Sequence, residues 1–231
     1  MLQENLAKVQ AKVQEALANR KEKKATGDKV TILAVTKNHP PEIVTEALAA
    51  GLTDVGENRV QEAMHKQEVL PPGGVWHLIG HLQTNKAKHA VEHFAIIESV
   101  DSEKIMQHLD KEAAALGKVQ DVLLQINEAG EEQKSGFAPE KVLPAAEAAL
   151  ERTHVRVRGL MTIPPADAQR DANFRYFQEV QALYVDMNQK LFHNELEYLS
   201  MGMSGDYEDA IRAGATMVRV GSAIFGARHY N

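Results

Sequence analysis

The sequence predicts an α/β protein whose parallel strands close into a (β/α)8 barrel of the TIM type. Eight short segments rich in Val, Ile and Leu alternate with helical segments, as parallel strands do with their crossover helices. The apolar, β-branched run from Val30 to Thr36 is typical of a strand buried on both faces. The roughly 200 residues after a first helix suffice for eight βα units. An open doubly wound sheet is the alternative fold.

An amphipathic helix is expected within residues 1–26, packed on the barrel. Apolar residues recur there at helical spacing: Leu6, Val9, Val13, Ala16 and Leu17. No Pro/Gly-rich linker long enough to divide the chain follows, so residues 1–231 are expected to form a single barrel domain.

The remaining elements follow from hydrophobic pattern and turn residues. Strands are predicted at Val30–Thr36, Thr53–Gly56, Val75–Ile79, Ala95–Ser99, Gln120–Asn127, Val155–Met161, Leu196–Ser200 and Met217–Val220. Helices are predicted between them at Pro41–Ala50, Arg59–Leu70, Thr84–Val91, Ser102–Leu116, Pro139–Arg152, Ala168–Asn188 and Asp206–Ala213.

Composition excludes several classes of protein. A net charge of −6 argues against a general nucleic-acid binder, which needs a basic face. The chain has no cysteine, which excludes disulfides, thiol catalysis and cysteine metal sites. No apolar stretch reaches membrane-spanning length. We therefore expect a cytoplasmic protein with neither nucleic acid nor membrane as partner.

Lys37 directly follows the first predicted strand and precedes Asn38 and two prolines. In a parallel barrel that end of the strand opens onto the active face. A partly desolvated lysine there can lose its proton and attack a carbonyl group. The alternative is a lysine that only extends its amine into solvent.

The loops after the last two strands contain small residues, in SMGMSGD at Ser200–Asp206 and in Gly221-Ser222. Backbone N–H groups in such loops can approach a phosphate, and barrels often bind phosphate at this place. Ordinary turn and capping chemistry is the alternative, with Ser204 and Asp206 capping the seventh helix. Taken with Lys37, the loops indicate a phosphate ester that carries an aldehyde.

Longer motifs resemble those of the pyridoxal phosphate homeostasis protein family, the YggS/PROSC type. They are AVTK ending at Lys37, GENRVQE at Gly56–Glu62, HLIGHLQTNK at His77–Lys86, GLMTI at Gly159–Ile163, LSMGMSGDYEDAI at Leu199–Ile211 and VRVGSAIFG at Val218–Gly226. The resemblance covers nearly the whole chain. It implies the barrel of alanine racemases, a fold-type III pyridoxal 5'-phosphate (PLP) barrel, without their second, β-rich domain.

The resemblance also implies PLP as cofactor, held as a Schiff base on Lys37. It implies further cofactor-binding residues: Ser200, Ser204, Gly221 and Ser222 around the phosphate, Arg219 at the pyridine nitrogen and Asn58 near the ring hydroxyl. For Asn58 the alternative is an N-cap of the helix that begins at Arg59. The family pattern places Lys134 near the rim, where a solvated loop lysine is the alternative.

Arg219 in this role has a chemical consequence. An arginine stays protonated and donates to the ring nitrogen, so it disfavours a protonated ring. An unprotonated ring is a weaker electron sink and supports carbanion chemistry less well. The expected function is therefore to buffer and deliver PLP, in vitamin B6 and amino-acid homeostasis, with no catalytic residue and no robust turnover. The expected partners are PLP and apo forms of PLP-dependent enzymes, and the expected state is a monomer.

Two other functions remain open. A PLP-dependent amino-acid racemase needs a second base opposite the lysine, usually a tyrosine, and Tyr207 is the nearest in the sequence to the active face. A barrel enzyme without PLP, acting on a sugar phosphate, is the third possibility. No metal site is expected. His89 to His93 matches the H-x-x-E-H pattern of some zinc peptidases, but it lies away from the predicted active face.

Overall fold

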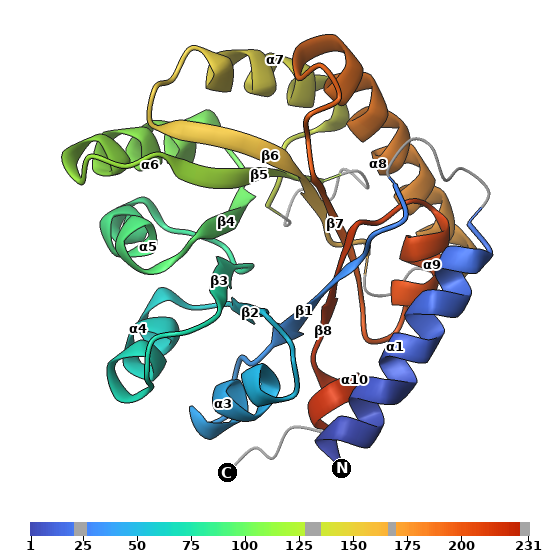
Figure 1. Ribbon diagram of the computed structural model, residues 1–231. Coiled ribbons are helices and arrows are strands. Elements are labelled where there is room, and N and C mark those ends of the chain that lie inside the picture. The colour runs from blue at the N-terminus through green and yellow to red at the C-terminus, as the bar shows by residue number, and fades with distance from the viewer. Residues whose placement is uncertain (21–26, 128–134, 166–169, 227–231) are drawn as a thin grey trace.

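The computed structural model describes residues 1–20, 27–127, 135–165 and 170–226. Eight strands form a ring, with helices around its outside (Figure 1). The order is β1 to β8, each strand is parallel to the next, and β8 pairs with β1 to close the barrel. The predicted (β/α)8 barrel is confirmed, and the open sheet is excluded because β8 meets β1.

All eight strands lie where the sequence predicts them: β1 Thr31–Val35, β2 Asp54–Glu57, β3 Val75–Leu78, β4 Ile96–Val100, β5 Gln120–Ile126, β6 Val155–Thr162, β7 Tyr198–Met203 and β8 Met217–Val220. β7 differs most, since it extends to Met203 instead of ending at Ser200. Gly202, at φ +94°, accompanies a register shift against β8 in this segment. A Cβ there would lie 2.6 Å from that of Ala210, so glycine allows the following helix to approach.

The helices predicted after the first strand are also found: α3 Glu42–Ala49, α4 Val60–Val69, η1 Thr84–Lys86 with α5 Ala87–His93, α6 Glu103–Ala115, α7 Pro139–Leu150, α8 Arg170–Leu191 and α9 Tyr207–Arg212. A further helix of four residues, α10 (Ser222–Phe225), follows β8. The predicted helix Thr84–Val91 starts as the 3-10 turn η1. Ser102 is the N-cap of α6, and its Oγ accepts from the Ile105 N–H at 3.3 Å. In the described ranges no helix is both long and apolar enough to cross a membrane.

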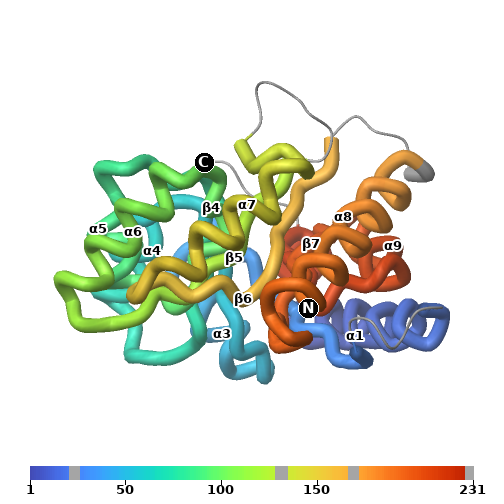
Figure 2. The backbone as a smooth tube through the Cα atoms, turned by 90° about the horizontal axis from the view of Figure 1, so that it is seen from above, coloured from blue at the N-terminus to red at the C-terminus, as the bar shows by residue number. Residues whose placement is uncertain are grey.

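The first helix, α1 (Leu2–Ala18), lies along the outside of the barrel against α9 and α10 (Figures 1 and 2). The face that it buries consists of the apolar residues Leu6, Val9, Val13 and Ala16. Because α10 has only four residues, α1 supplies much of the cover beside β8. Residues 21–26 lie outside the described ranges, and the extent of the domain stays a prediction.

Arg20 connects the end of α1 to the rest of the barrel. Its guanidinium donates to the carbonyl oxygens of Ile211 at 2.7 Å and Ala215 at 2.6 Å. The side chain is buried, and burial lowers its pKa. These bonds hold α1 against the turn between α9 and β8, and that turn leads into the strand that carries Arg219.

Candidate functional site

A pocket of about 230 Å³ lies at the carboxyl ends of the strands. Six of the seven predicted cofactor-binding residues line it: Lys37, Asn58, Ser204, Arg219, Gly221 and Ser222. Its other lining residues are Val35, Ile79, Ile163, Met203 and Gly205. The closed barrel thus joins the end of β1 to the loops after β2, β7 and β8, and no carboxylate lies among the lining residues that the structure describes.

The backbone on each side of Lys37 is held by side chains of α4. The Thr36 carbonyl oxygen accepts from Lys66 Nζ at 2.8 Å. The Asn38 N–H donates to Glu62 Oε1 at 2.6 Å. Asn38 has φ +60°, a left-handed conformation that asparagine tolerates, so the chain turns sharply after Lys37. The lysine therefore leaves β1 from a fixed position.

The same contacts belong to a buried ionic network that the sequence analysis missed. Lys66 Nζ lies 2.6 Å from Glu57 Oε1 and 2.9 Å from Glu62 Oε1. Thr36 Oγ1 also donates to Glu57 Oε1 at 2.6 Å. Glu57 Oε2 is buried and finds no hydrogen-bond partner among the described residues. Burial raises the pKa of Glu57 more than Lys66 and Thr36 lower it.

A pattern in the sequence points to this network. Lys66 follows Val60 and Ala63 on the face of α4 that is buried against the barrel. A lysine on the apolar stripe of an amphipathic helix needs a partner, because burying an unpaired charge is costly.

Asn58 lines the pocket and does not cap α4. The N-cap of α4 is Arg59, and no side chain makes a capping hydrogen bond there, so the N-cap alternative is wrong. The loop after β3 lies against it, since a Cβ on Gly80 would lie 2.2 Å from the Asn58 carbonyl oxygen. Only glycine permits that approach.

Backbone donors gather at Ser204. Its Oγ accepts from the N–H groups of Gly221 at 3.2 Å and Ala223 at 3.3 Å. The predicted capping of the seventh helix by Ser204 is therefore wrong. Asp206 is the N-cap residue of α9, and its Oδ1 accepts from the Met203 N–H at 2.7 Å. Two N–H groups and a hydroxyl thus converge at one corner of the pocket, an arrangement that suits an anion.

Arg219 lines the pocket and is almost fully buried. Its Nη1 donates to Ser200 Oγ at 2.8 Å, and its Nη2 donates to the Thr162 carbonyl oxygen at 2.7 Å. Burial lowers the pKa of Arg219, while the charges of Glu98 and Asp206 oppose that effect. Because arginine keeps its proton in proteins, the guanidinium is a cation, and its two hydrogen bonds fix its orientation.

Ser200 is the predicted residue that does not line the pocket. It is fully buried, and its Oγ donates to Glu98 Oε2 at 2.6 Å while accepting from Arg219. Both hydrogen bonds are made below the pocket. Its contact with phosphate stays a prediction, and the geometry instead supports a link between Arg219 and Glu98.

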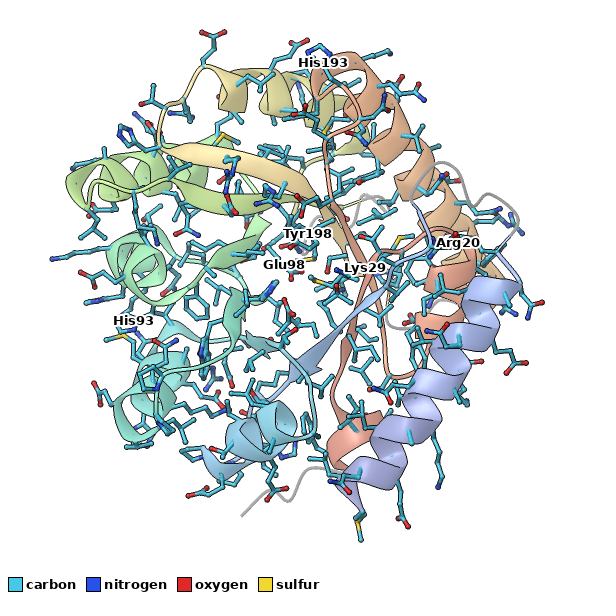
Figure 3. The ribbon with its side chains drawn as sticks, viewed as in Figure 1. Arg20, Lys29, His93, Glu98, His193 and Tyr198 are labelled. Atoms are coloured by element: carbon cyan, nitrogen blue, oxygen red, sulfur yellow. The ribbon has the colours of Figure 1, made fainter. Side chains whose placement is uncertain are left out.

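Glu98, which lies inside the ring of strands (Figure 3), and His77 extend this link, and both side chains are fully buried. His77 Nδ1 lies 2.8 Å from Glu98 Oε1, and His77 Nε2 lies 2.9 Å from Asp54 Oδ1. Burial alone lowers the pKa of His77, but the two carboxylates outweigh it and raise the pKa to about 9. Burial alone raises the pKa of Asp54. The hydrogen bonds from His77 and Thr53 outweigh burial, so the pKa of Asp54 lies below its ordinary value. One feature of the sequence indicates these hydrogen bonds: Glu98 is a charged residue within the buried strand IIESV.

Other residues singled out from the sequence lie elsewhere. Tyr207 is 4% exposed and packs in the core, so it does not reach the pocket. His89 bonds Glu92, whereas His93 bonds Gln67, so the two histidines of the H-x-x-E-H pattern have different partners. Lys134 lies outside the described residues.

Three larger hollows lie on the outer surface. Their volumes are about 530 Å³ beside the amino end of β6, about 500 Å³ between α1, α8 and α9, and about 330 Å³ between the end of α4 and the start of β3. None of the three is lined by a predicted site residue. The pocket at the carboxyl ends of the strands is the candidate site, because it alone among these four joins a lysine amine to converging N–H donors.

Comparisons with known proteins agree with this geometry. The profile of the family "Alanine racemase, N-terminal domain" matches residues 5–229. The pyridoxal phosphate homeostasis protein of Pseudomonas aeruginosa is 45% identical over 228 residues, which are 98% of this chain and 96% of that protein. The protein of the same name from Escherichia coli K12 is 38% identical over 231 residues, 98% of this chain and 97% of that protein.

Solved structures give the same result. PipY of Synechococcus elongatus PCC7942, with PLP bound, is 35% identical with a TM-score of 0.82 and covers 98% of this chain and 100% of its own. Alanine racemase of Clostridium difficile has a TM-score of 0.71 at 17% identity, over 95% of this chain and 57% of that enzyme, which shows a shared fold. The chain therefore belongs to the pyridoxal phosphate homeostasis protein family, whose barrel is that of the alanine racemase N-terminal domain.

Proposed function

We propose that this chain binds PLP in the pocket at the carboxyl end of its barrel, and buffers and delivers it without robust turnover. The observation that carries the proposal is the meeting of Lys37 with the Ser204 corner and with Arg219 in one pocket. The names of the relatives and the PLP in PipY support it. Vitamin B6 and amino-acid homeostasis is the corresponding role in the cell.

The residues present fit PLP. The phosphate is a dianion, and the pocket has two cationic side chains, Lys37 and Arg219, with no carboxylate among its described lining. The N–H groups that converge on Ser204 are the kind of donors that bind phosphate. A volume of about 230 Å³ suits a small ligand, since drug-sized ligands need about 300 Å³ or more.

When bound, PLP supplies an aldehyde that an amine can attack and a pyridine ring that can withdraw electrons. In this proposal Lys37 holds that aldehyde as a Schiff base. Ser204, Gly221 and Ser222 hold the phosphate, and Asn58 lies on the hydroxyl side of the ring. Arg219 donates an N–H to the ring nitrogen and so disfavours its protonation.

Two features favour binding and release of PLP over catalytic turnover. An arginine at the ring nitrogen weakens the ring as an electron sink. In addition, none of the four tyrosines in the described part of the chain lines the pocket, which leaves a racemase without its usual second base. Delivery requires an open site, and Ile163 and Met203 at the rim are 37% and 38% exposed. We propose that residues 1–231 act as one monomeric domain and pass PLP to apo PLP-dependent enzymes.

The test is the visible spectrum of the purified protein with PLP, before and after borohydride, with the modified lysine mapped by mass spectrometry. Lys37→Ala should abolish the covalent adduct and leave the fold intact, because the change lies at the pocket. Lys29→Ala is the matched control, since Lys29 is exposed at the opposite end of the β1 region (Figure 3). An adduct that persists in Lys37→Ala contradicts the assignment. Absence of both band and adduct in the wild-type protein favours the enzyme without PLP.

A second experiment addresses turnover. Amino acids are incubated with the PLP-loaded protein in deuterated buffer, and exchange of the α-hydrogen is followed. We expect no sustained exchange or racemisation. Sustained racemisation that Lys37→Ala abolishes overturns the proposal in favour of a racemase.

A further inference from the structure

A continuous chain of hydrogen bonds crosses the barrel interior and ends at Arg219 in the pocket. From the far end it runs Asp54 to His77 at 2.9 Å, His77 to Glu98 at 2.8 Å, Glu98 to Ser200 at 2.6 Å and Ser200 to Arg219 at 2.8 Å. All five residues are buried, with Asp54 the most exposed at 9%. The proposed binding of PLP gives no role to His77 and Glu98, the second and third residues of this chain.

With Asp54 and Glu98 ionised, the donors and acceptors in this chain fit together in one way. Carboxylates only accept, so His77 donates from both ring nitrogens and is an imidazolium ion. Ser200 donates its hydrogen to Glu98, which leaves its oxygen to accept from Arg219, a residue that only donates. The charges consequently alternate along the chain: Asp54 negative, His77 positive, Glu98 negative and Arg219 positive.

These hydrogen bonds hold the guanidinium of Arg219 in one orientation. Arg219 has five N–H donors, and the bonds to Ser200 and Thr162 use two of them. Because Arg219 also lines the pocket, the remaining donors can meet a ligand there. Ser200 connects the guanidinium to Glu98, since its Oγ accepts from Arg219 Nη1 and donates to Glu98 Oε2.

We propose that Glu98 and His77 are positioning residues for PLP, acting through Ser200 to aim and charge-balance the guanidinium of Arg219. The inference rests on the proposed binding of PLP and adds the residues that tune it. Neither positioning residue touches the pocket itself. A change in either therefore acts on the cofactor indirectly, through Ser200 and Arg219.

The test uses three variants of the full chain, measured as apo-protein and with added PLP. Ser200→Ala removes the link, and Glu98→Gln keeps the shape but removes the charge. Tyr184→Phe is the control, because it removes a buried hydrogen bond, to the Leu196 carbonyl oxygen at 2.8 Å, outside the pocket. The readouts are PLP affinity, the absorption maximum of bound PLP and the melting temperature of the apo-protein.

We expect Ser200→Ala and Glu98→Gln each to weaken PLP affinity by about tenfold or more and to move the absorption maximum. Tyr184→Phe should lower the melting temperature and change neither. If both linked variants keep wild-type affinity and spectrum, the chain is structural only and the inference is overturned. If the wild-type protein itself fails to bind PLP, the proposed function fails as well, so the two failures are distinguishable.

A measurement on the wild-type chain decides the matter if the variants do not fold. In ¹⁵N-histidine spectra, His77→Gln identifies the His77 signals among the ten histidines. We expect both His77 nitrogens to be protonated near pH 8 and their shifts to move when PLP is added. Shifts that stay unchanged on PLP binding overturn the inference. A neutral His77 does the same, because the alternating charge is then absent.

Discussion

Glu98 accepts a hydrogen bond from Ser200 at 2.6 Å, although 102 residues separate them in the chain. Glu98 belongs to β4 and Ser200 to β7, strands that are not neighbours in the sheet. The bond crosses the interior and exists because the sheet closes into a barrel. Hydrogen bonds thereby connect Asp54 on β2, His77 on β3 and Glu98 on β4 to the guanidinium of Arg219 on β8.

Arg219→Lys should weaken PLP binding and alter the spectrum of the bound cofactor. Lysine keeps the charge but lacks the planar fork that bonds Ser200 and the Thr162 carbonyl oxygen together. We expect a loss of about tenfold in affinity, measured by titration of apo-protein with PLP. Arg219→Ala should lose more, because it removes the positive charge as well as both hydrogen bonds and leaves Glu98 with His77 as its one remaining cationic neighbour in this chain of hydrogen bonds. Unchanged affinity and spectrum in both variants would refute contact with the ring.

Ser204→Ala should weaken the binding of phosphate in particular. The change leaves the N–H groups of Gly221 and Ala223 without their present acceptor and removes one donor to the anion. Affinity for PLP should fall by about fivefold to tenfold, while affinity for pyridoxal, which lacks phosphate, should stay the same. Ser102→Ala is the control, since it removes only the N-cap of α6 and should cost about 1 kcal/mol of stability. Equal losses for PLP and pyridoxal would place the phosphate elsewhere.

Lys66→Met should destabilise the protein by about 3–5 kcal/mol, because it leaves Glu57 as an unpaired buried carboxylate. The free energy of unfolding is measured by urea denaturation of the apo-protein. The double variant Glu57→Gln with Lys66→Met should recover part of the loss, since no unpaired charge remains at Glu57. Lys12→Met, which breaks an exposed pair with Glu208, should leave the free energy of unfolding almost unchanged. A loss for Lys66→Met as small as for Lys12→Met would mean that the network is not stabilising.

Stability should fall as the pH rises from about 6.5 to about 9, because of His77. Its folded-state pKa of about 9 exceeds the unfolded value of 6.5, so the folded protein binds the proton more tightly. The contribution is complete below the unfolded pKa and is lost above the folded pKa. Its size is on the order of 3 kcal/mol, from about 1.4 kcal/mol for each pKa unit. The carboxyl groups that face His77 are those of Asp54 and Glu98.

The measurement is the free energy of unfolding at about pH 6 and about pH 10. The difference should shrink in His77→Gln, which removes the titrating group. His93→Gln is a suitable comparison, because its ring is partly exposed and bonds only a neutral amide, Gln67. The same pH dependence in wild-type protein and His77→Gln would show that another group is responsible.

The position of a residue relative to the end of its strand decides whether its place in the pocket can be predicted from the sequence. Residues that directly follow a strand are predicted to lie at one face, since parallel strands all end at the same face of a barrel. Lys37, Arg219 and Gly221 come from opposite ends of the chain and still meet in one pocket. Ser200 was harder to place, because β7 extends to Met203 and carries Ser200 below the pocket instead of into the loop.

The barrel, the order of its elements and most of the residues around the pocket can be predicted from the sequence alone. Hydrophobic periodicity and turn residues are local signals, and parallel strands of a barrel all end at one face. The meetings of buried polar groups, such as Glu98 with Ser200 and Lys66 with Glu57, become visible in the three-dimensional structure. A strand of a parallel barrel is buried on both faces, so alternation alone does not distinguish a side chain inside the barrel from one beneath a helix. The partners across the interior are set by closure of the sheet and the stagger of its strands, and no local pattern encodes either.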